Sequence, residues 1–177
     1  MTQNQILIGK FMIKPFHLWD VQWLLLTSGD FSKSHFNSMT IGWGSVGIMW
    51  RRPFIQVVVR PHRYTYEFME EYDSFTVCAF PDEFHEALQL LGTRSGRQSD
   101  KTLESGLTPM GSSLIPAPGF AEASLTLECR KIYWEDFDPA NFLDRSIEEN
   151  YPKKDFHRMY FGEILAIFGD DSFSSPS

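Results

Sequence analysis

The segment that most constrains the fold occupies residues 37–65 and reads NSMTIGWGSVGIMWRRPFIQVVVRPHRYT. Its glycines Gly42, Gly44 and Gly47 match the GxGxxG pattern, which binds dinucleotide phosphates where it joins a strand to a helix. Here β-branched and aromatic residues, two arginines, a proline and the apolar run FIQVVV follow instead. The pattern therefore predicts glycines within or between two strands, and it argues against a Rossmann domain.

Composition limits the kind of partner. The chain has 177 residues, which is enough for one domain with a sizeable core, and a formal net charge of −7. An acidic chain has no general attraction for nucleic acid or anionic lipid, so we expect a small molecule or a protein as partner, and neither nucleic acid nor membrane. No signal-peptide core or membrane-length apolar run is present, so a cytoplasmic protein is expected.

The cysteines and histidines show no metal-binding pattern. Cys78 and Cys129 are far apart, lie in alternating apolar runs and are expected to be small core residues. The five histidines show neither HxxxH nor HExxH spacing. The sequence therefore predicts no metal site.

Strands dominate the expected secondary structure. Apolar or alternating runs bounded by Gly, Pro, Asp or Ser predict strands at residues 23–27, 39–46, 54–59, 74–80, 123–133 and 157–168. In the run from Ala123, apolar and polar residues alternate clearly, so one face is expected in the core and the other at solvent or an interface. The expected class is mainly β with short helices.

Two helices interrupt these strands. Residues 63–72 place aromatic side chains every four positions opposite glutamates, and residues 82–91 carry an apolar stripe that ends at Gly92, a normal helix C-cap residue. We expect a single domain over residues 1–168 and a disordered polar tail over residues 169–177.

The start of the first predicted helix favours an anion. Four residues there have suitable side chains: Arg60, Arg63, Tyr64 and Thr65. Free backbone N–H groups and the positive end of the helix dipole add to two guanidinium groups and hydroxyls, a combination that suits a phosphate monoester. The alternative is that the arginines pair with Glu67 and Glu70 of the same helix in solvated ion pairs that contribute little.

The strand before it favours a planar ligand. Gly42 and Gly44 allow close approach to the backbone, whose amides can read a carbonyl and nitrogen edge, and Ser38 and Thr40 add hydroxyls. The alternative is an ordinary strand with a bulge. Other catalytic patterns are not indicated, because the chain has no GxSxG elbow and its paired carboxylates have the sequence context of surface charges.

At this point the chain resembles a known family. The segments that carry the resemblance are NSMTIGWGSVGIMW, RPFIQVVVRPHRYTYEF, GTRSGRQSDKTLESGLTP, AEASLTLECRKIYWEDF and HRMYFGEILAIF. They are similar to the flavin reductase-like, FMN-binding split-barrel family, particularly its flavoredoxin-like branch, over residues 23–168. The ordered combination of MTxxWG, VRPxRYTYEF and SGRxxDK is more specific than any one of these motifs.

The resemblance implies a Greek-key split β-barrel that forms a homodimer and holds FMN noncovalently in a groove at the subunit interface. Carried over residue by residue, the flavin contacts are Asn37, Ser38, Met39, Thr40 and Ile41 for the ring and ribityl chain, Arg63, Tyr64 and Thr65 near the phosphate, and Lys101 as a further contact. Relatives commonly have an acidic residue where this chain has Gln98, so the contacts of that loop are expected to differ.

The implied function is redox chemistry. An FMN-dependent NAD(P)H oxidoreductase would pass hydride from the nicotinamide to flavin N5, and the electrons would go on to an acceptor. Arg97 and His157 are candidates for the nicotinamide or substrate side, from their positions in a polar loop and at a strand start. The alternatives are a flavoredoxin-type FMN electron carrier that serves a redox protein partner with little NAD(P)H activity, or a dimer without enzymatic activity.

Overall fold

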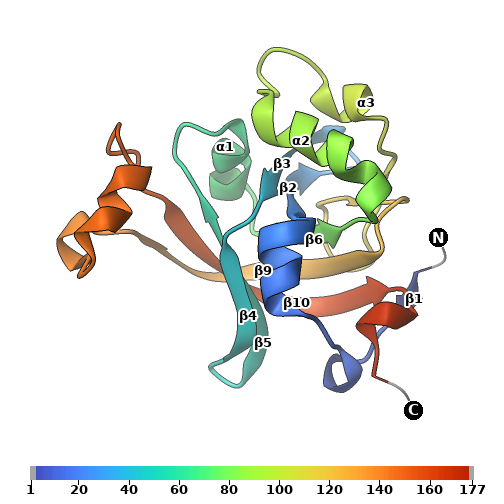
Figure 1. The fold of residues 1–177 in the computed structure, drawn as a ribbon. Helices are drawn as coiled ribbons and strands as arrows, with labels where there is room; N and C mark the ends of the chain where they lie inside the picture. Colours follow the sequence, from blue (N-terminus) through green and yellow to red (C-terminus); the bar gives the residue numbers. More distant parts are fainter. Residues whose placement is uncertain (1–2, 176–177) are drawn as a thin grey trace.

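A computed structural model describes residues 3–175; residues 1, 2, 176 and 177 lie outside the description. One antiparallel sheet of eight strands has the order β3-β2-β6-β9-β10-β5-β4, with β1 paired to β10 (Figure 1). Its strands are β1 (Asn4–Gln5), β2 (Leu24–Asp30), β3 (His35–Ile41), β4 (Gly44–Met49), β5 (Arg52–Val59), β6 (Ser74–Ala79), β9 (Leu125–Asp136) and β10 (Arg158–Gly169). The mainly β class and the Greek-key split barrel are confirmed.

Short helices and a small second sheet complete the fold. Strands β7 (Pro109–Met110) and β8 (Gly119–Phe120) pair with each other. The α-helices are α1 (Tyr64–Glu71), α2 (His85–Thr93) and α3 (Lys101–Ser105), and a π-helical segment spans His17–Gln22. Single 3-10 segments lie at Ile8–Lys10, Asp82–Phe84, Pro139–Asn141, Arg145–Asn150 and Asp171–Phe173.

The core is divided by the sheet into two apolar clusters. Along β2, Leu24 and Leu26 belong to the larger cluster and Leu25 to the second, because successive side chains of a strand point to opposite faces. The second cluster lies under α2, which contributes Leu88 and Leu91. Both faces of β2 are therefore covered, and this explains its continuous apolar run LLL.

The predicted strand at residues 39–46 is in fact two strands. Strand β3 ends at Ile41 and β4 begins at Gly44, and the two lie at opposite edges of the sheet, so the chain crosses from one edge to the other through Gly42 and Trp43. A Cβ on Gly44 would lie 2.3 Å from the carbonyl oxygen of Gln56. The glycine pattern thus serves strand packing, as expected, and no helix follows it.

Strand β9 departs from the expected two-faced pattern. Leu125, Leu127 and Cys129 face the larger cluster, as predicted. The opposite face is also buried at Thr126 and Glu128, because the segment between β7 and β8 covers it. The Glu128 carboxylate accepts hydrogen bonds from backbone N–H groups of residues 113 and 114 at 2.7 and 2.8 Å. The expectation of solvent or an interface on that face is therefore wrong at these two positions.

The helices also differ in detail from their prediction. Helix α1 agrees with the expected helix, but α2 continues through Gly92 to Thr93, so Gly92 is not a cap. Its missing side chain instead lets α2 approach β3, since a Cβ there would lie 3.1 Å from Thr40. Lys101 begins α3, which Asp100 caps.

Two segments lie at the ends of β10. Residues 169–175, expected to be a disordered tail, are ordered here: Phe173 is buried, and the backbone N–H of Ser175 donates to the carbonyl of Lys10 at 2.8 Å. Apolar burial explains this difference; residues 176 and 177 lie outside the described part.

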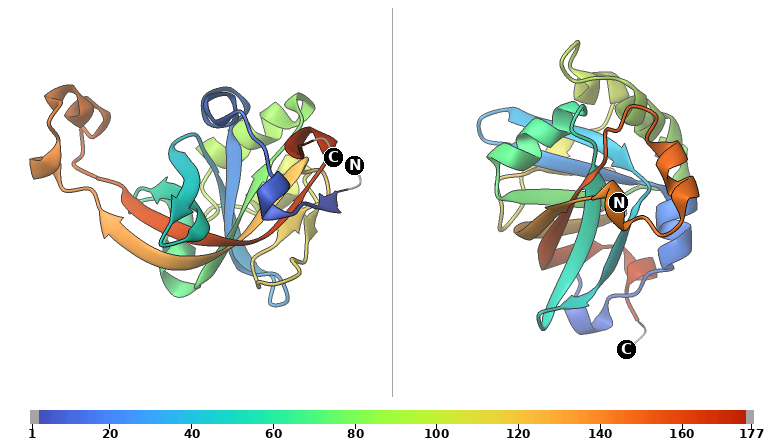
Figure 2. Two further views of the ribbon diagram at one scale, coloured as in Figure 1. Left: turned by 90° about the horizontal axis from the view of Figure 1, so that it is seen from below. Right: turned by 90° about the vertical axis from the view of Figure 1, so that its left-hand side faces the viewer.

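Between β9 and β10, residues 137–157 form an arm that projects from the barrel (Figure 2).

Candidate functional site

A first pocket of about 370 Å³ opens beside the crossing from β3 to β4. It is lined by Met39, Thr40, Ile41, Gly42, Trp43, Val58, Arg60, His62, Arg63 and His157. Strand β3 is an edge strand, so within the described residues no further strand pairs with its outer N–H and C=O groups. The pocket therefore combines an unpaired backbone edge with the arginines that precede α1.

The predicted strand residues divide between this pocket and the interior. Met39, Thr40 and Ile41 line the pocket. Ser38 is buried and its hydroxyl is 2.7 Å from that of Thr27, and the Thr40 hydroxyl donates to the carbonyl of Leu88 on α2. Both hydroxyls are used within the protein, so a planar ligand here would meet mainly the backbone of β3.

The residues at the start of α1 surround a junction between two cavities. Arg60 and Arg63 line the first pocket, whereas Tyr64 lines a second one. Thr65 is buried, and its Oγ1 accepts a hydrogen bond of 2.7 Å from Nδ2 of Asn37, which also lines the second pocket. The structure thus brings the strand and the helix start together.

The alternative in which the arginines pair with glutamates of α1 is wrong. Arg60 pairs instead with Asp155 of the arm at 3.2 Å. The two glutamates have other partners, Arg97 for Glu67 and Arg158 for Glu70. Arg63 donates to the carbonyl of Gly92 at 2.8 Å and, within residues 3–175, has no carboxylate within 4.0 Å.

Lys101 is a second cation that has no carboxylate partner among the described residues. Its side chain is buried, and Nζ donates to the carbonyls of Leu91 and Arg94 at 2.9 and 3.2 Å. Burial, followed by the charge of Arg63, lowers the pKa of Lys101 to about 8. Burial, followed by the charge of Arg60, also lowers the pKa of Arg63.

These two cations gather at the C-terminal end of α2. The dipole of a helix supplies only about half a negative charge at that end. Within the described chain, no ion pair joins a carboxylate to either Arg63 or Lys101. Most of two positive charges is therefore uncompensated, and the site is electrostatically suited to an anion such as a phosphate.

The second pocket, of about 720 Å³, adjoins the first. Asn37 and Tyr64 line the second pocket. Their near neighbours in the chain, Met39 and Arg63, line the first pocket. Its other lining residues include aromatic side chains of β3 and α1 and the loop at residues 96–103, with Arg97 and Lys101. The guanidinium carbon of Arg97 lies 4.8 Å from the centre of the Tyr64 ring.

The arm contributes His157 to the first pocket. Its Nδ1 is 2.8 Å from the hydroxyl of Tyr151, and its ring centre is 5.2 Å from that of Trp43. Burial, with a smaller effect of the Arg60 charge, lowers the pKa of His157 to about 4. The ring is therefore neutral at pH 7 and offers a hydrogen bond rather than a charge.

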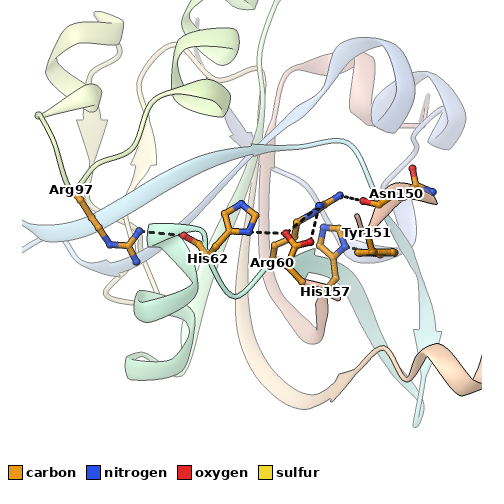
Figure 3. A network of polar contacts seen from close by, with 7 residues as sticks. Arg60, His62, Arg97, Asn150, Tyr151 and His157 are labelled. Carbon is orange, nitrogen blue, oxygen red and sulfur yellow. Dashed lines mark hydrogen bonds and ion pairs between the residues drawn. The ribbon is translucent and has the colours of Figure 1, made fainter. Parts of the chain in front are cut away.

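A network of polar contacts fixes the arm to this pocket. Figure 3 shows that Arg97 contacts His62 and that His62 and Arg60 each contact residues of the arm. Arg60 donates to the carbonyl of Asn150 at 2.9 Å, and Asp155 accepts from both Arg60 and His62. No sequence pattern indicates Asp155 as a partner of Arg60, because the two residues are 95 positions apart in the chain.

The fold places the protein in the class of antiparallel split barrels. Its first pocket lies at the open edge of the sheet and is lined by arginines. The family model for the flavin reductase like domain matches residues 22–174. The chain belongs to the flavin reductase-like family. The resemblance stated from the sequence is thereby confirmed at the level of the family.

Solved structures show the same fold. The flavoredoxin of Desulfovibrio vulgaris is 23% identical with a TM-score of 0.65, and the match covers 85% of this chain and 70% of that one. An FMN-binding domain of a flavin reductase-like enzyme from Shewanella baltica is 18% identical with a TM-score of 0.69, covering 96% and 78%. Flavoredoxin from Methanosarcina acetivorans is 24% identical with a TM-score of 0.64, covering 97% and 75%.

No curated protein matches the sequence. Within residues 3–175, no helix has the length and apolar character needed to span a membrane, and no cluster of three or more His, Cys, Asp or Glu is placed to hold a metal ion.

Proposed function

We propose that the chain binds FMN and acts as an NAD(P)H-dependent oxidoreductase. The flavin ring would lie in the first pocket against the edge of β3, and the phosphate would lie at the junction with the second pocket. The observation that carries this proposal is the pair of cations, the half-buried Arg63 and the buried Lys101, beside a strand edge that is unpaired within residues 3–175. Their charges lack carboxylate partners in the described chain, and a phosphate supplies the missing negative charge.

The residues of this chain would bind and orient the cofactor. When bound, FMN supplies the hydride-accepting N5 atom and passes electrons on. Backbone N–H groups of β3 would hold the polar edge of the ring and favour negative charge there. The neutral ring of His157, held by Tyr151, faces the same pocket and would position the nicotinamide by a hydrogen bond, while Trp43 shields one side from water.

A homodimer is part of the proposal. Large side chains at the pocket mouth and along β4 and β9 are exposed, with fractions of 48% for Trp43, 67% for Ile48, 58% for Trp50 and 42% for Tyr133. Trp50 contacts Tyr133, with ring centres 5.9 Å apart, so part of this surface is continuous. A surface of this kind is typical of an interface, and a second copy would cover the open first pocket. Sedimentation at several protein concentrations measures the state, and a monomer at all of them would contradict the dimer.

The test is the visible spectrum of the purified protein. A flavin-loaded protein is expected to be yellow, and NADH or NADPH is expected to bleach it under anaerobic conditions. The double substitution Arg63→Ala and Thr65→Ala is expected to weaken FMN binding by about 2–4 kcal/mol, because charge-assisted contacts to the phosphate are lost. Arg51→Ala, at the exposed turn between β4 and β5, is the matched control and is expected to change nothing. A protein that binds no added FMN would refute the proposal.

A flavoredoxin-type electron carrier is the second candidate. The similarity of the fold to two flavoredoxins favours it. Such a carrier would take its electrons from a redox protein and react slowly with pyridine nucleotides. Stopped-flow reduction by NADH and by NADPH discriminates, since reduction within the turnover time of an enzyme supports the oxidoreductase and reduction over many minutes supports the carrier.

A further inference from the structure

We propose that a third cavity, between β9 and the segment that joins β7 to β8, binds a small organic cation with a primary ammonium group on an apolar body. This cavity shares no lining residue with the two pockets described above, and the inference does not rest on the flavin function. It is carried by a buried carboxylate in the cavity wall, by the hydrogen-bond acceptors beside it and by the apolar side chains that complete the lining.

The cavity is large enough for a small molecule. Its volume is about 520 Å³, which falls within the range of about 300–1,000 Å³ that is usual for such sites. Residues 110–113 and 119–121 form one wall, and Thr126 and Glu128 of β9 form another. Gln3 and Phe168 of β10 complete the lining. A ligand there would contact segments that are distant from one another in the chain.

The charged group of the cavity is the carboxylate of Glu128. The side chain is only 2% exposed, although it lines the cavity. Each of its two oxygens accepts one backbone N–H, from residue 113 at 2.7 Å and from residue 114 at 2.8 Å. An ionised carboxylate offers about four acceptor positions. About half of the acceptor capacity therefore remains for a ligand.

No cation of the described chain neutralises this charge. Within residues 3–175, no ion pair includes Glu128, and the nearby Arg130 of β9 pairs instead with Glu163 at 2.6 Å. The cavity lining itself contains no Lys, Arg or His. A buried charge is costly unless it is paired, and two neutral N–H groups compensate only part of that cost. The cavity is thus electrostatically suited to a cation.

The other polar groups of the lining offer acceptors rather than donors. The Ser112 hydroxyl donates to the carbonyl of Ala117, so its oxygen keeps its lone pairs. The side-chain amide of Gln3 donates to the carbonyl of Ala123, and its own oxygen remains an acceptor. An ammonium group has three donors and no acceptor, which matches a carboxylate with acceptors of this kind beside it.

The remaining lining suits an apolar body. Phe120 is buried, Phe168 is half-buried, and Met110 is exposed. Aromatic and aliphatic side chains of this kind favour an alkyl or aryl group, and the face of an aromatic ring also attracts a cation. An organic ammonium ion uses both properties of the cavity.

A metal ion is the other cation that a carboxylate attracts. Calcium takes about six to eight oxygen ligands, and magnesium is usually held by one or two carboxylates together with substrate phosphates. Glu128 is the single carboxylate of this lining, and residues 3–175 contain no cluster of three or more His, Cys, Asp or Glu placed to hold a metal. The organic cation is therefore the better match.

The test uses the full chain, with benzylammonium chloride as the probe. Calorimetric titration compares it with benzyl alcohol, which has the same ring without the charge, and with benzoate, which has the opposite charge. Benzylammonium is expected to bind at least about tenfold tighter than either. The amide NMR signals of residues 113 and 114 are expected to shift with the same affinity, because their N–H groups contact Glu128.

Two substitutions test the role of the carboxylate. Glu128→Gln is expected to weaken benzylammonium about tenfold and to leave benzyl alcohol within about twofold. Glu122→Gln is the matched control, since that carboxylate also accepts a backbone N–H but does not line the cavity. Because Glu128→Gln also weakens the fold, Met110→Lys gives an independent test at an exposed position. Its ammonium group is expected to weaken benzylammonium about fivefold by repulsion, whereas Met110→Leu is expected to keep the parent affinity.

Several results would overturn the inference. These are benzylammonium binding no tighter than benzyl alcohol, an unchanged affinity in both Glu128→Gln and Met110→Lys, or amide shifts confined to residues remote from 113 and 114. Tighter binding of Nα-acetyl-lysine amide than of benzylammonium would assign the ammonium group to a side chain of another protein and overturn the small-molecule assignment. Each of these results leaves the proposed flavin function standing, since titration with FMN tests that function separately.

Discussion

We expect Lys101 to make the proposed affinity for the FMN phosphate dependent on pH. Its pKa is lowered from an ordinary value of 10.5 to about 8, first by burial and then by the charge of Arg63. That difference corresponds to about 3 kcal/mol that disfavours the ammonium form in the protein without ligand. A phosphate beside Nζ favours the charged form and raises the pKa again. The complex therefore holds more protons than the free protein, and binding weakens as the pH rises.

The size of the effect follows from the same pKa. Between pH 7 and pH 9, the protonated share of Lys101 falls from about nine-tenths to about one-tenth. A phosphate monoester loses its second proton near pH 6, so its own charge is nearly constant over this interval. If FMN binds only the protonated form, its association constant falls about tenfold from pH 7 to pH 9.

The assay is a fluorescence titration with FMN and with riboflavin at several pH values and constant ionic strength. The ratio of the two association constants isolates the phosphate, because both ligands share the ring. Lys101→Arg keeps its charge throughout and is expected to abolish the fall in that ratio. Lys153→Arg, at an exposed position of the arm, is the control and is expected to behave as the parent. A ratio that is constant from pH 7 to pH 9 in the parent protein would refute the placement of Lys101 at the phosphate.

Three other changes test the packing and the pocket. Gly44→Ala is expected to lower the free energy of unfolding, measured by urea titration, by about 1–3 kcal/mol, because the new Cβ meets a backbone carbonyl at 2.3 Å. Gly9→Ala is the control and is expected to be neutral, because a Cβ there has nothing within 4 Å. Glu128→Gln is expected to lower it by about 1–3 kcal/mol, since an amide cannot accept both backbone N–H bonds without presenting its own donor to one of them. Tyr151→Phe releases Nδ1 of His157 and is expected to raise the KM for NAD(P)H with FMN affinity unchanged, as steady-state kinetics and titration would show.

The sequence predicted the elements whose signal is local. Most strands and helix α1 follow from alternation and from the four-residue spacing of its aromatic side chains. The family resemblance also implied that β3 and the start of α1 lie close together, because it assigns residues of both segments to one FMN. Gly92 was misread because a glycine at a helix end and a glycine at a close helix–strand contact have the same local context.

The remaining features depend on contacts between distant segments. The buried face of β9 at Glu128 is created by the segment between β7 and β8, which no alternation in β9 can reveal. The uncompensated charge of Arg63 and Lys101 appears only when their neighbours are known, since nearby glutamates in the sequence pair with other arginines. The pocket position of His157 likewise depends on the path of the arm.

Arg60 has two attachments that cannot be changed independently. It lines the first pocket, and it also holds the arm through Asp155 and the carbonyl of Asn150. An anion that draws the guanidinium toward the pocket alters the same contacts that restrain local opening of residues 137–157. If an anion binds Arg60 in this way, amide hydrogen exchange in the arm is expected to change with occupancy of the pocket. The exchange rate of a segment far from the barrel core would then report whether the pocket is filled.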